Sequence, residues 1–500
     1  CPPQWAPMGI EINNTDFSPE DYAAFTARLE ENLSALADLA NEPGFGQGPG
    51  SLGAELEMYI VDGDGNPLYA NQEILADAKD PQLTLELNRY NLEYNLSPYR
   101  LDASPFHATE QEILAKLTYL RGVADQRGGR IVPIGILPTL RQSDFGTHCI
   151  TDRRRYHALV EQLIRRRGGD FRIDINGEEP LKLEMSDITL EGANTSFQVH
   201  YKVKPENYAD TFNSMQLMTP LALAIGANSP TLFGNSLWHE TRVPLFKQSI
   251  DTRHVDRYGW NEPARVSFGQ GWARRGAGEL FREVVRIYPP LLPICADVSP
   301  ADDVAAGKVP TLAELRLHQS TVWLWNRPIY DDTQGGHLRV EMRALPAGPT
   351  PVDMVANAAL LIGLAEGIRP RINELLPGLP FHIAEYNFYR AAQFGLDASL
   401  VWPESDQSGY REQPVCSILE RLLPVAREGL DAIGIDAGES AHYLGVIQQR
   451  LERRQSGAVW QRKMLARLQK KMPPQPALHE LLEKFIGHSV QNLPVAEWPL

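Results

Sequence analysis

Glu55 and Glu57 stand two residues apart within an apolar run over residues 51–62. Side chains alternate between the two faces of a β-strand, so both carboxylates would lie on one face. Like charges side by side on a sheet are unfavourable unless a cation neutralises them, and Mg²⁺ prefers carboxylate oxygens. The alternative is the solvent-exposed face of an antiparallel strand, where charged residues are common. The motif by itself leaves both interpretations open.

Further segments carry residues that would complete a metal site, namely Glu86, Glu93, His200, Glu341 and Arg343. Carboxylates with one neutral imidazole suit several Mg²⁺ ions, or Mn²⁺. Arg343 shares a strand face with Glu341 and would stabilise charge on a transferring phosphoryl group. Glu86 and Glu93 have opposite strand parity, so one site can include both only if a bulge or turn lies between them. Alone, His200 would more often be an ordinary hydrogen-bonded histidine.

The elements that must position these residues mix strands and helices without regular βαβ alternation, which predicts the α+β class. Helical spacing follows the N-cap signal at Ser18 and returns in several later segments. A glycine-rich passage over residues 44–50 leads into the first strand; it lacks a Lys-Ser/Thr pair and precedes a strand, so we expect a flexible lead-in rather than a phosphate-binding loop. Strands are expected at 51–61, 83–96, 130–137, 196–203 and 336–345, and helices at 18–40, 105–126, 152–167, 206–227, 351–376 and over much of 400–500.

Composition narrows the class of protein. The chain has 500 residues, a net charge of −15 and 43% hydrophobic residues. The acidic balance argues against a nucleic-acid partner, and no apolar run reaches the roughly 20 residues that cross a membrane. Four cysteines form no CxxC pair, which fits a reducing compartment, and the first residues lack the features of a signal peptide. These features predict a cytoplasmic protein; the oligomeric state is open, a homo-oligomer included.

In their order, the motifs resemble those of the glutamate–cysteine ligase family of the second type, the carboxylate–amine ligases, and more distantly glutamine synthetase. The motifs are Gly53-Ala-Glu55-Leu-Glu57, Glu86 and Glu93 with six residues between them, Thr195-Ser-Phe-Gln198-Val-His200, and Val340-Glu341-Met-Arg343. The resemblance spans roughly residues 50–375. It departs from the family in the alanine of the first motif, and residues 400–500 lie outside it, which leaves the substrate rather than the fold in question.

The resemblance implies a curved, funnel-shaped antiparallel sheet with helices outside and two or three Mg²⁺ ions inside. It implies that Glu57, Glu86 and Glu93 hold the metal beside the acceptor carboxylate. It assigns Glu55, His200 and Glu341 to metal on the ATP phosphates, and Arg343 to the γ-phosphoryl group, with Glu341 and Arg343 as the catalytic pair. By the same resemblance, substrate or ATP contacts fall to Gln198, Arg242, Arg253, Arg327 and Arg343.

The reaction implied joins a carboxylate, such as glutamate, to an amine, such as cysteine, through an acyl phosphate made from ATP. The alternatives are a phosphotransferase like the guanidino kinases and a non-catalytic metal- or nucleotide-binding relative. We expect a catalytic domain over residues 1–400 and a helical extension over 401–500 packed on it. In that extension Arg450, Arg454, Gly457 and Trp460 form either a lid over the substrate or a surface helix with an aromatic anchor; the sequence favours the surface helix.

Overall fold

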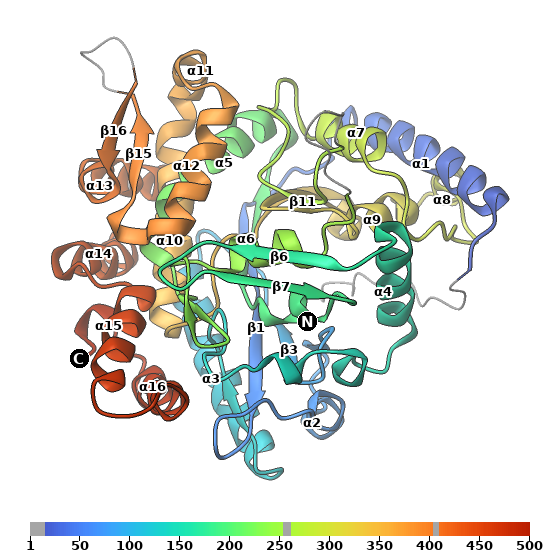
Figure 1. Ribbon diagram of the computed structural model, residues 1–500. Helices are drawn as coiled ribbons and strands as arrows, with labels where there is room; N and C mark the ends of the chain where they lie inside the picture. Colours follow the sequence, from blue (N-terminus) through green and yellow to red (C-terminus); the bar gives the residue numbers. More distant parts are fainter. Residues whose placement is uncertain (1–15, 254–261, 404–409) are drawn as a thin grey trace.

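A computed structural model describes residues 16–253, 262–403 and 410–500, and its centre is a curled antiparallel sheet (Figure 1). The sheet has eight strands in the order β13-β14-β8-β1-β3-β2, and β4 and β5 also pair with β1. This confirms the predicted α+β class and the curved antiparallel sheet. The strands are β1 (Ser51–Val61), β2 (Leu83–Leu85), β3 (Asn91–Asn95), β4 (Tyr99–Arg100), β5 (Arg130–Val132), β8 (Phe197–Val203), β13 (Asn326–Asp331) and β14 (His337–Met342).

The register of this sheet aligns the polar residues of neighbouring strands. β1 lies between β8 and β3, so the side chains of Glu55 and Glu57 have neighbours on both sides. Residues that are directly opposite across antiparallel strands share a face, so one face collects the predicted polar side chains. The opposed pairs are Glu57 with Glu93, Glu55 with Gln198, Gly53 with His200, His200 with Glu341, and Glu341 with Arg327.

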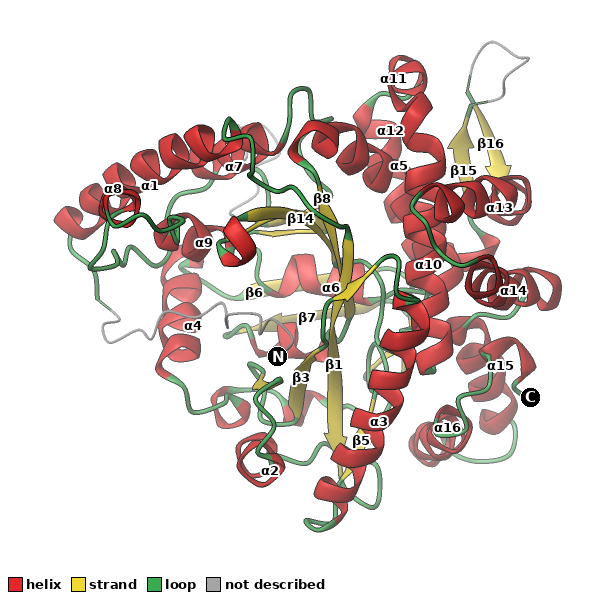
Figure 2. Ribbon diagram, turned by 180° about the vertical axis from the view of Figure 1, so that it is seen from behind, coloured by secondary structure: helices red, strands yellow, loops and turns green. Residues whose placement is uncertain are grey.

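Long apolar helices cover the outer side of the sheet (Figure 2). They are α3 (Pro105–Asp125), α5 (Tyr208–Gly226) and α10 (Pro351–Ile368). α5 and α10 are buried along almost their whole length, because their apolar residues surround the helix axis instead of forming one stripe. The segment Pro351–Gly378 is long and apolar enough to cross a membrane, but 94% of its most apolar window is buried, as in the core helix of a globular protein.

The remaining elements frame the inner face or extend the edges. α1 (Pro19–Ala40) begins at the predicted cap, where the Ser18 hydroxyl accepts a hydrogen bond from the Asp21 backbone N–H at 3.2 Å. The predicted strand over 130–137 ends at Val132, since Pro133 has no N–H to donate to a ladder. The other elements are α2 (Asn71–Ala78), α4 (Arg154–Arg167), β6 (Phe171–Ile175), β7 (Leu181–Met185), β9 (Thr231–Leu232), β10 (Asn235–Ser236), α6 (Arg242–Ser249), β11 (Val266–Ser267), α7 (Ala277–Ile287), α8 (Pro300–Ala305), α9 (Ala313–Gln319), β12 (Trp323–Leu324), α11 (Ile372–Leu375), α12 (Phe381–Phe394), β15 (Ser399–Trp402) and β16 (Arg411–Pro414).

Of the four C-terminal helices, α13 and α14 pack against α10, and α15 and α16 pack against each other (Figure 1). They are α13 (Val415–Ala432), α14 (Ala437–Arg453), α15 (Gly457–Gln469) and α16 (Pro474–Ser489). α13 crosses α10 so closely at Gly429 that a side chain there would collide with the backbone of Gly363 and Gly367.

The structure confirms the aromatic anchor at Trp460 but corrects the placement of Arg450, which the surface-helix interpretation would leave exposed. Arg450 is 1% exposed, and its guanidinium forms an ion pair with Asp353 of α10 at 2.9 Å. Trp460 is fully buried and packs edge-on against Trp498. These two buried side chains fix α14 and α15 to the interior, which does not fit a lid that opens over the substrate. Arg454 is exposed, and Gly457 lies against Asn228.

Candidate active site

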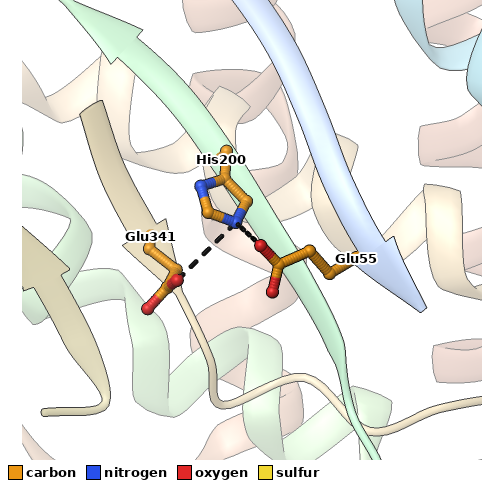
Figure 3. A group of neighbouring side chains, drawn as sticks. All are labelled: Glu55, His200 and Glu341. Atoms are coloured by element: carbon orange, nitrogen blue, oxygen red, sulfur yellow. Dashed lines mark ion pairs between the residues drawn. The ribbon is translucent and has the colours of Figure 1, made fainter. Parts of the chain in front are cut away.

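The first group of side chains on the inner face is Glu55, His200 and Glu341, contributed by β1, β8 and β14 (Figure 3). The His200 Nε2 atom lies 3.1 Å from a Glu55 oxygen and 3.7 Å from a Glu341 oxygen. One potential ligand atom from each residue lies within 4.8 Å of the others. Two carboxylates and an imidazole at this spacing match the ligand preferences of Mg²⁺ or Mn²⁺.

Two arginines surround the fully buried carboxylate of Glu341. Arg327, opposite Glu341 on β13, donates two hydrogen bonds to it, at 2.7 and 2.9 Å. Arg343 adds a third at 3.1 Å. Burial disfavours the ionised carboxylate, but the charges of these guanidiniums and of His200 outweigh it and hold the pKa of Glu341 well below its usual range. Glu341 is therefore an anion and an available ligand throughout the physiological pH range.

The second group is Glu57, Glu86 and Glu93, whose ligand atoms also lie within 4.8 Å of one another. Glu93 pairs with Glu57 across β1 and β3, and Glu86 follows directly after β2. The chain reverses direction between β2 and β3. This is the turn between Glu86 and Glu93 that their opposite strand parity requires if both are to reach one site.

Three half-buried carboxylates this close together are electrostatically unfavourable without a counter-charge. Burial, followed by the charges of Glu55 and Glu57, raises the pKa of Glu93 to about 8. Burial and the charge of Glu93 raise the pKa of Glu86 well above its usual value, and burial raises that of Glu57. A divalent cation would remove this penalty, so the donor set fits a hard metal ion.

A polar bridge connects the two groups. Gln198 donates from Nε2 to Glu57 at 2.7 Å and accepts from the Arg343 guanidinium through Oε1. Arg343 also contacts Glu341, so a continuous chain of contacts runs from Glu57 to Glu341. The backbone N–H of Ser196 donates to the second Glu57 oxygen at 2.6 Å. Arg343 is thereby held between the two carboxylate groups, where a guanidinium can meet an anion placed between them.

Two predicted arginines are engaged with acids of their own segments. Arg242 is buried, pairs with Glu240 at 2.9 Å and donates to the Ala344 carbonyl at 2.6 Å. Burial raises the pKa of Glu57, and the charges of Arg343 and Arg242 offset part of that rise. Arg253 pairs with Asp251 at 2.8 Å. Within residues 16–253, 262–403 and 410–500, neither guanidinium forms a hydrogen bond or ion pair with the two carboxylate groups, and their roles toward substrate stay predictions.

Sequence reasoning missed Glu191, which lies beside the second group. Burial, followed by the charge of Glu57, raises its pKa to about 7. Glu191 belongs to a short 3₁₀ turn over Thr189–Ala193. A turn of this length has no periodicity that could have indicated which way the side chain points.

Comparison with known proteins agrees with the fold and with the motifs. The model of the glutamate–cysteine ligase family 2 matches residues 51–484, which extends the similarity well beyond residue 375, to most of the C-terminal helices. A curated relative from Frankia alni, named "Putative glutamate–cysteine ligase 2-1", is 25% identical over 388 residues, covering 75% of this chain and 82% of that protein.

A solved structure extends the comparison to the fold. The glutamate–cysteine ligase of Francisella tularensis, crystallised with AMP, has a TM-score of 0.54 at 11% identity and covers 91% of each chain. At this identity the likeness bears on the fold alone. The family match spans most of the sequence, and the chain belongs to the glutamate–cysteine ligase family 2, a family of ligases.

Proposed function

We propose that this protein is an ATP- and Mg²⁺-dependent ligase that joins a carboxylate, glutamate in the first instance, to an amine such as cysteine. The observation that carries the proposal is the pair of ligand groups on one sheet face, bridged by Gln198 and Arg343. Two anions, a carboxylate and a triphosphate, must approach each other in such a reaction. A face with two cation-binding groups and an arginine between them is suited to that approach.

The metal assignments follow the two groups. We assign Glu55, His200 and Glu341 to one or two ions on the nucleotide phosphates, and Glu57, Glu86 and Glu93 to the ion beside the acceptor carboxylate. Mn²⁺ would also suit the group that contains the imidazole. When bound, such ions neutralise phosphate and carboxylate charge and act as Lewis acids.

The residues of the chain then have separate tasks. Arg343 binds the γ-phosphoryl group and stabilises the charge that spreads over its oxygens during transfer. Arg327 keeps Glu341 ionised and fixed in orientation. An oxygen of the acceptor carboxylate attacks the γ-phosphorus and ADP leaves. The amine nitrogen then attacks the acyl carbon, phosphate leaves with that oxygen, and the amine loses a proton.

We also propose that the protein acts in the cytoplasm on small-molecule substrates. Cys149, Cys295 and Cys416 are free thiols, as expected in a reducing cytoplasm. The substrates would be small molecules, because the two groups lie on the inner face of the sheet.

The proposal is tested by assaying ADP and phosphate release with ATP, Mg²⁺, glutamate and a panel of amines that includes cysteine. Wild-type protein should release both products only when the acceptor and a suitable amine are present. Glu341→Gln, which preserves shape but removes the charge between Arg327 and Arg343, should lose at least about 100-fold in rate, as enzymes do when a single transition-state contact is removed. Glu184→Gln, on the exposed side of β7, is the matched control and should be fully active.

Other outcomes would contradict the proposal in distinct ways. ADP without free phosphate would indicate a phosphotransferase. Product release that does not depend on an amine would mean that no amide is formed. The absence of turnover with glutamate and every amine of the panel would reject the proposed substrate pair.

A further inference from the structure

The inner face of the sheet changes charge along its strands. Beyond His200, the next residue of β8 on this face is Lys202, and Arg339 of β14 lies directly opposite it. Two residues along a strand advance about 7 Å, so this basic pair lies one step past the first carboxylate group. The second carboxylate group lies in the other direction, at Glu57 and Glu93. Along this face the second carboxylate group comes first, Arg343 and the first carboxylate group follow, and the basic pair of Lys202 and Arg339 comes last.

Lys202 is an unusual residue at this position. Its side chain is only 9% exposed, and its ammonium donates to the backbone carbonyl of Gln47 at 3.2 Å. No ion pair with an acid is found for Lys202 among residues 16–253, 262–403 and 410–500. The nearby carboxylate of Asp331 is paired with Arg339 at 3.0 Å. Buried lysines are rare unless they are paired, because removing the charge from water is costly. The buried ammonium of Lys202 would therefore be stabilised by a bound anion.

The glycine-rich passage covers this basic end. It is anchored and not the flexible lead-in expected from the sequence: the Gly46 N–H donates to the Gly336 carbonyl at 3.0 Å, and Phe45 stacks on Tyr330. Gly48 has a φ of 99°, and a Cβ atom there would lie 3.9 Å from the Lys202 Nζ atom. The loop therefore passes directly beside the ammonium and limits its access to bulk water.

We propose that Lys202 binds the α–β end of the nucleotide polyphosphate, under the loop of residues 44–50. This inference rests on the proposed function, which places the γ-phosphoryl group at Arg343 and the following phosphate beside Glu55, His200 and Glu341. A polyphosphate that starts at Arg343 and passes this group continues along β8 to Lys202. A compact ammonium suits a phosphate oxygen as a point charge. Lys202 is a binding residue in this proposal and takes no part in the transfer itself.

The test compares Lys202→Met with Lys204→Met, an exposed lysine two residues further along. ADP binding in the presence of Mg²⁺ is measured by calorimetry, and the KM values for ATP and for the acceptor are measured separately. Lys202→Met should weaken ADP binding and raise the KM for ATP by about ten-fold or more, as expected for one lost charge-assisted hydrogen bond. The KM for the acceptor should be unchanged, Lys204→Met should match the wild type, and Lys202→Arg should recover part of the affinity.

Thermal unfolding without nucleotide separates a binding role from a structural one. An ammonium that is buried without an anion opposes folding, so Lys202→Met should unfold at a higher temperature than the wild type. A residue that serves the fold would give the opposite shift. If Lys202→Met is poorly folded, the binding comparison is made with Lys202→Gln, and a folded Lys202→Gln that binds ADP like the wild type rejects the inference.

The outcomes also separate this inference from the proposed function. If the wild type binds ADP and turns over while Lys202→Met binds ADP equally well, the inference is wrong and the proposed function stands. If the wild type binds neither ADP nor ATP, the proposed function is contradicted, and the assignment of Lys202 to a nucleotide fails with it.

Discussion

The buried pair of Arg450 and Asp353 should account for much of the attachment of the C-terminal helices. We propose that residues 401–500 pack on the catalytic domain of residues 1–400 through this contact. The Arg450 guanidinium meets Asp353 Oδ1 through Nη2 at 2.9 Å and through Nε at 3.2 Å, and it also donates to Asn357. Neither member of the pair is open to solvent. Arg450→Met leaves a carboxylate inside the protein without its counter-charge.

The expected size of the effect follows from this burial. Removing one partner of a buried ion pair costs about 3–5 kcal/mol. Asp353 keeps hydrogen bonds from the Thr350 hydroxyl at 2.6 Å and the Val495 N–H at 2.9 Å, which favours the lower part of that range. For a chain of 500 residues the entropy of unfolding is about 1 kcal/mol per degree, so the melting temperature should fall by about 3–4 °C.

Differential scanning calorimetry of four proteins measures this effect. They are the wild type, Arg450→Met, Asp353→Asn with Arg450→Met, and the exposed control Arg453→Met. The double variant has no buried charge left unpaired, so it should lose less stability than Arg450→Met alone. An Arg450→Met protein that melts within about 1 °C of the wild type would show that this ion pair does not hold the C-terminal helices in place. A double variant that is less stable than the single one would refute the unpaired charge as the cause of the loss.

Two further predictions concern metal and pH. Burial and neighbouring acids raise the pKa of Glu93 to about 8, so the folded chain without metal protonates this carboxyl near pH 7. Glu93→Gln should therefore raise the free energy of unfolding in EDTA by about 3 kcal/mol and reduce the stabilisation by Mg²⁺. A loss of stability in EDTA would contradict the metal assignment. Burial lowers the pKa of His239 and of His318 to about 4. Between pH 6.5 and pH 4 these histidines are therefore protonated only in the unfolded chain. The free energy of unfolding should fall by about 3 kcal/mol for each histidine as the pH is lowered through this range. The slope of stability against pH should be shallower in His318→Gln, and equal slopes would exclude this explanation.

Much of the candidate site could be predicted because it depends on strand periodicity. The two-residue spacing of Glu55 and Glu57 placed both on one face, and the resemblance to the ligase family grouped His200 and Glu341 with Glu55, on strands that the structure shows to be neighbours. The opposite parity of Glu86 and Glu93 required a turn, and the structure has one. In each case a local rule, side-chain alternation or loss of register, decides which way the residue points.

The rest could not be predicted because it depends on contacts between distant segments. Arg450 follows a surface-like helical pattern, and its burial depends on Asp353, which lies 97 residues away. Glu191 sits on an irregular turn beside Glu57, without a periodicity to orient it. Lys202 continues the side-chain alternation of β8, but its burial depends on the loop of residues 44–50, which was expected to be flexible. The burial of such a charged residue cannot be predicted from the local sequence, because it depends on which distant residues surround the charge.

The most direct test of the central claim follows an oxygen atom through the reaction. The acceptor carboxylate is labelled with ¹⁸O, turned over with ATP, Mg²⁺ and the amine that the assay identifies, and the released phosphate is analysed by mass spectrometry. An acyl phosphate intermediate requires one carboxylate oxygen to leave with the phosphate, so each turnover should give phosphate that contains one ¹⁸O atom. Phosphate without ¹⁸O, formed together with the amide, would contradict the account.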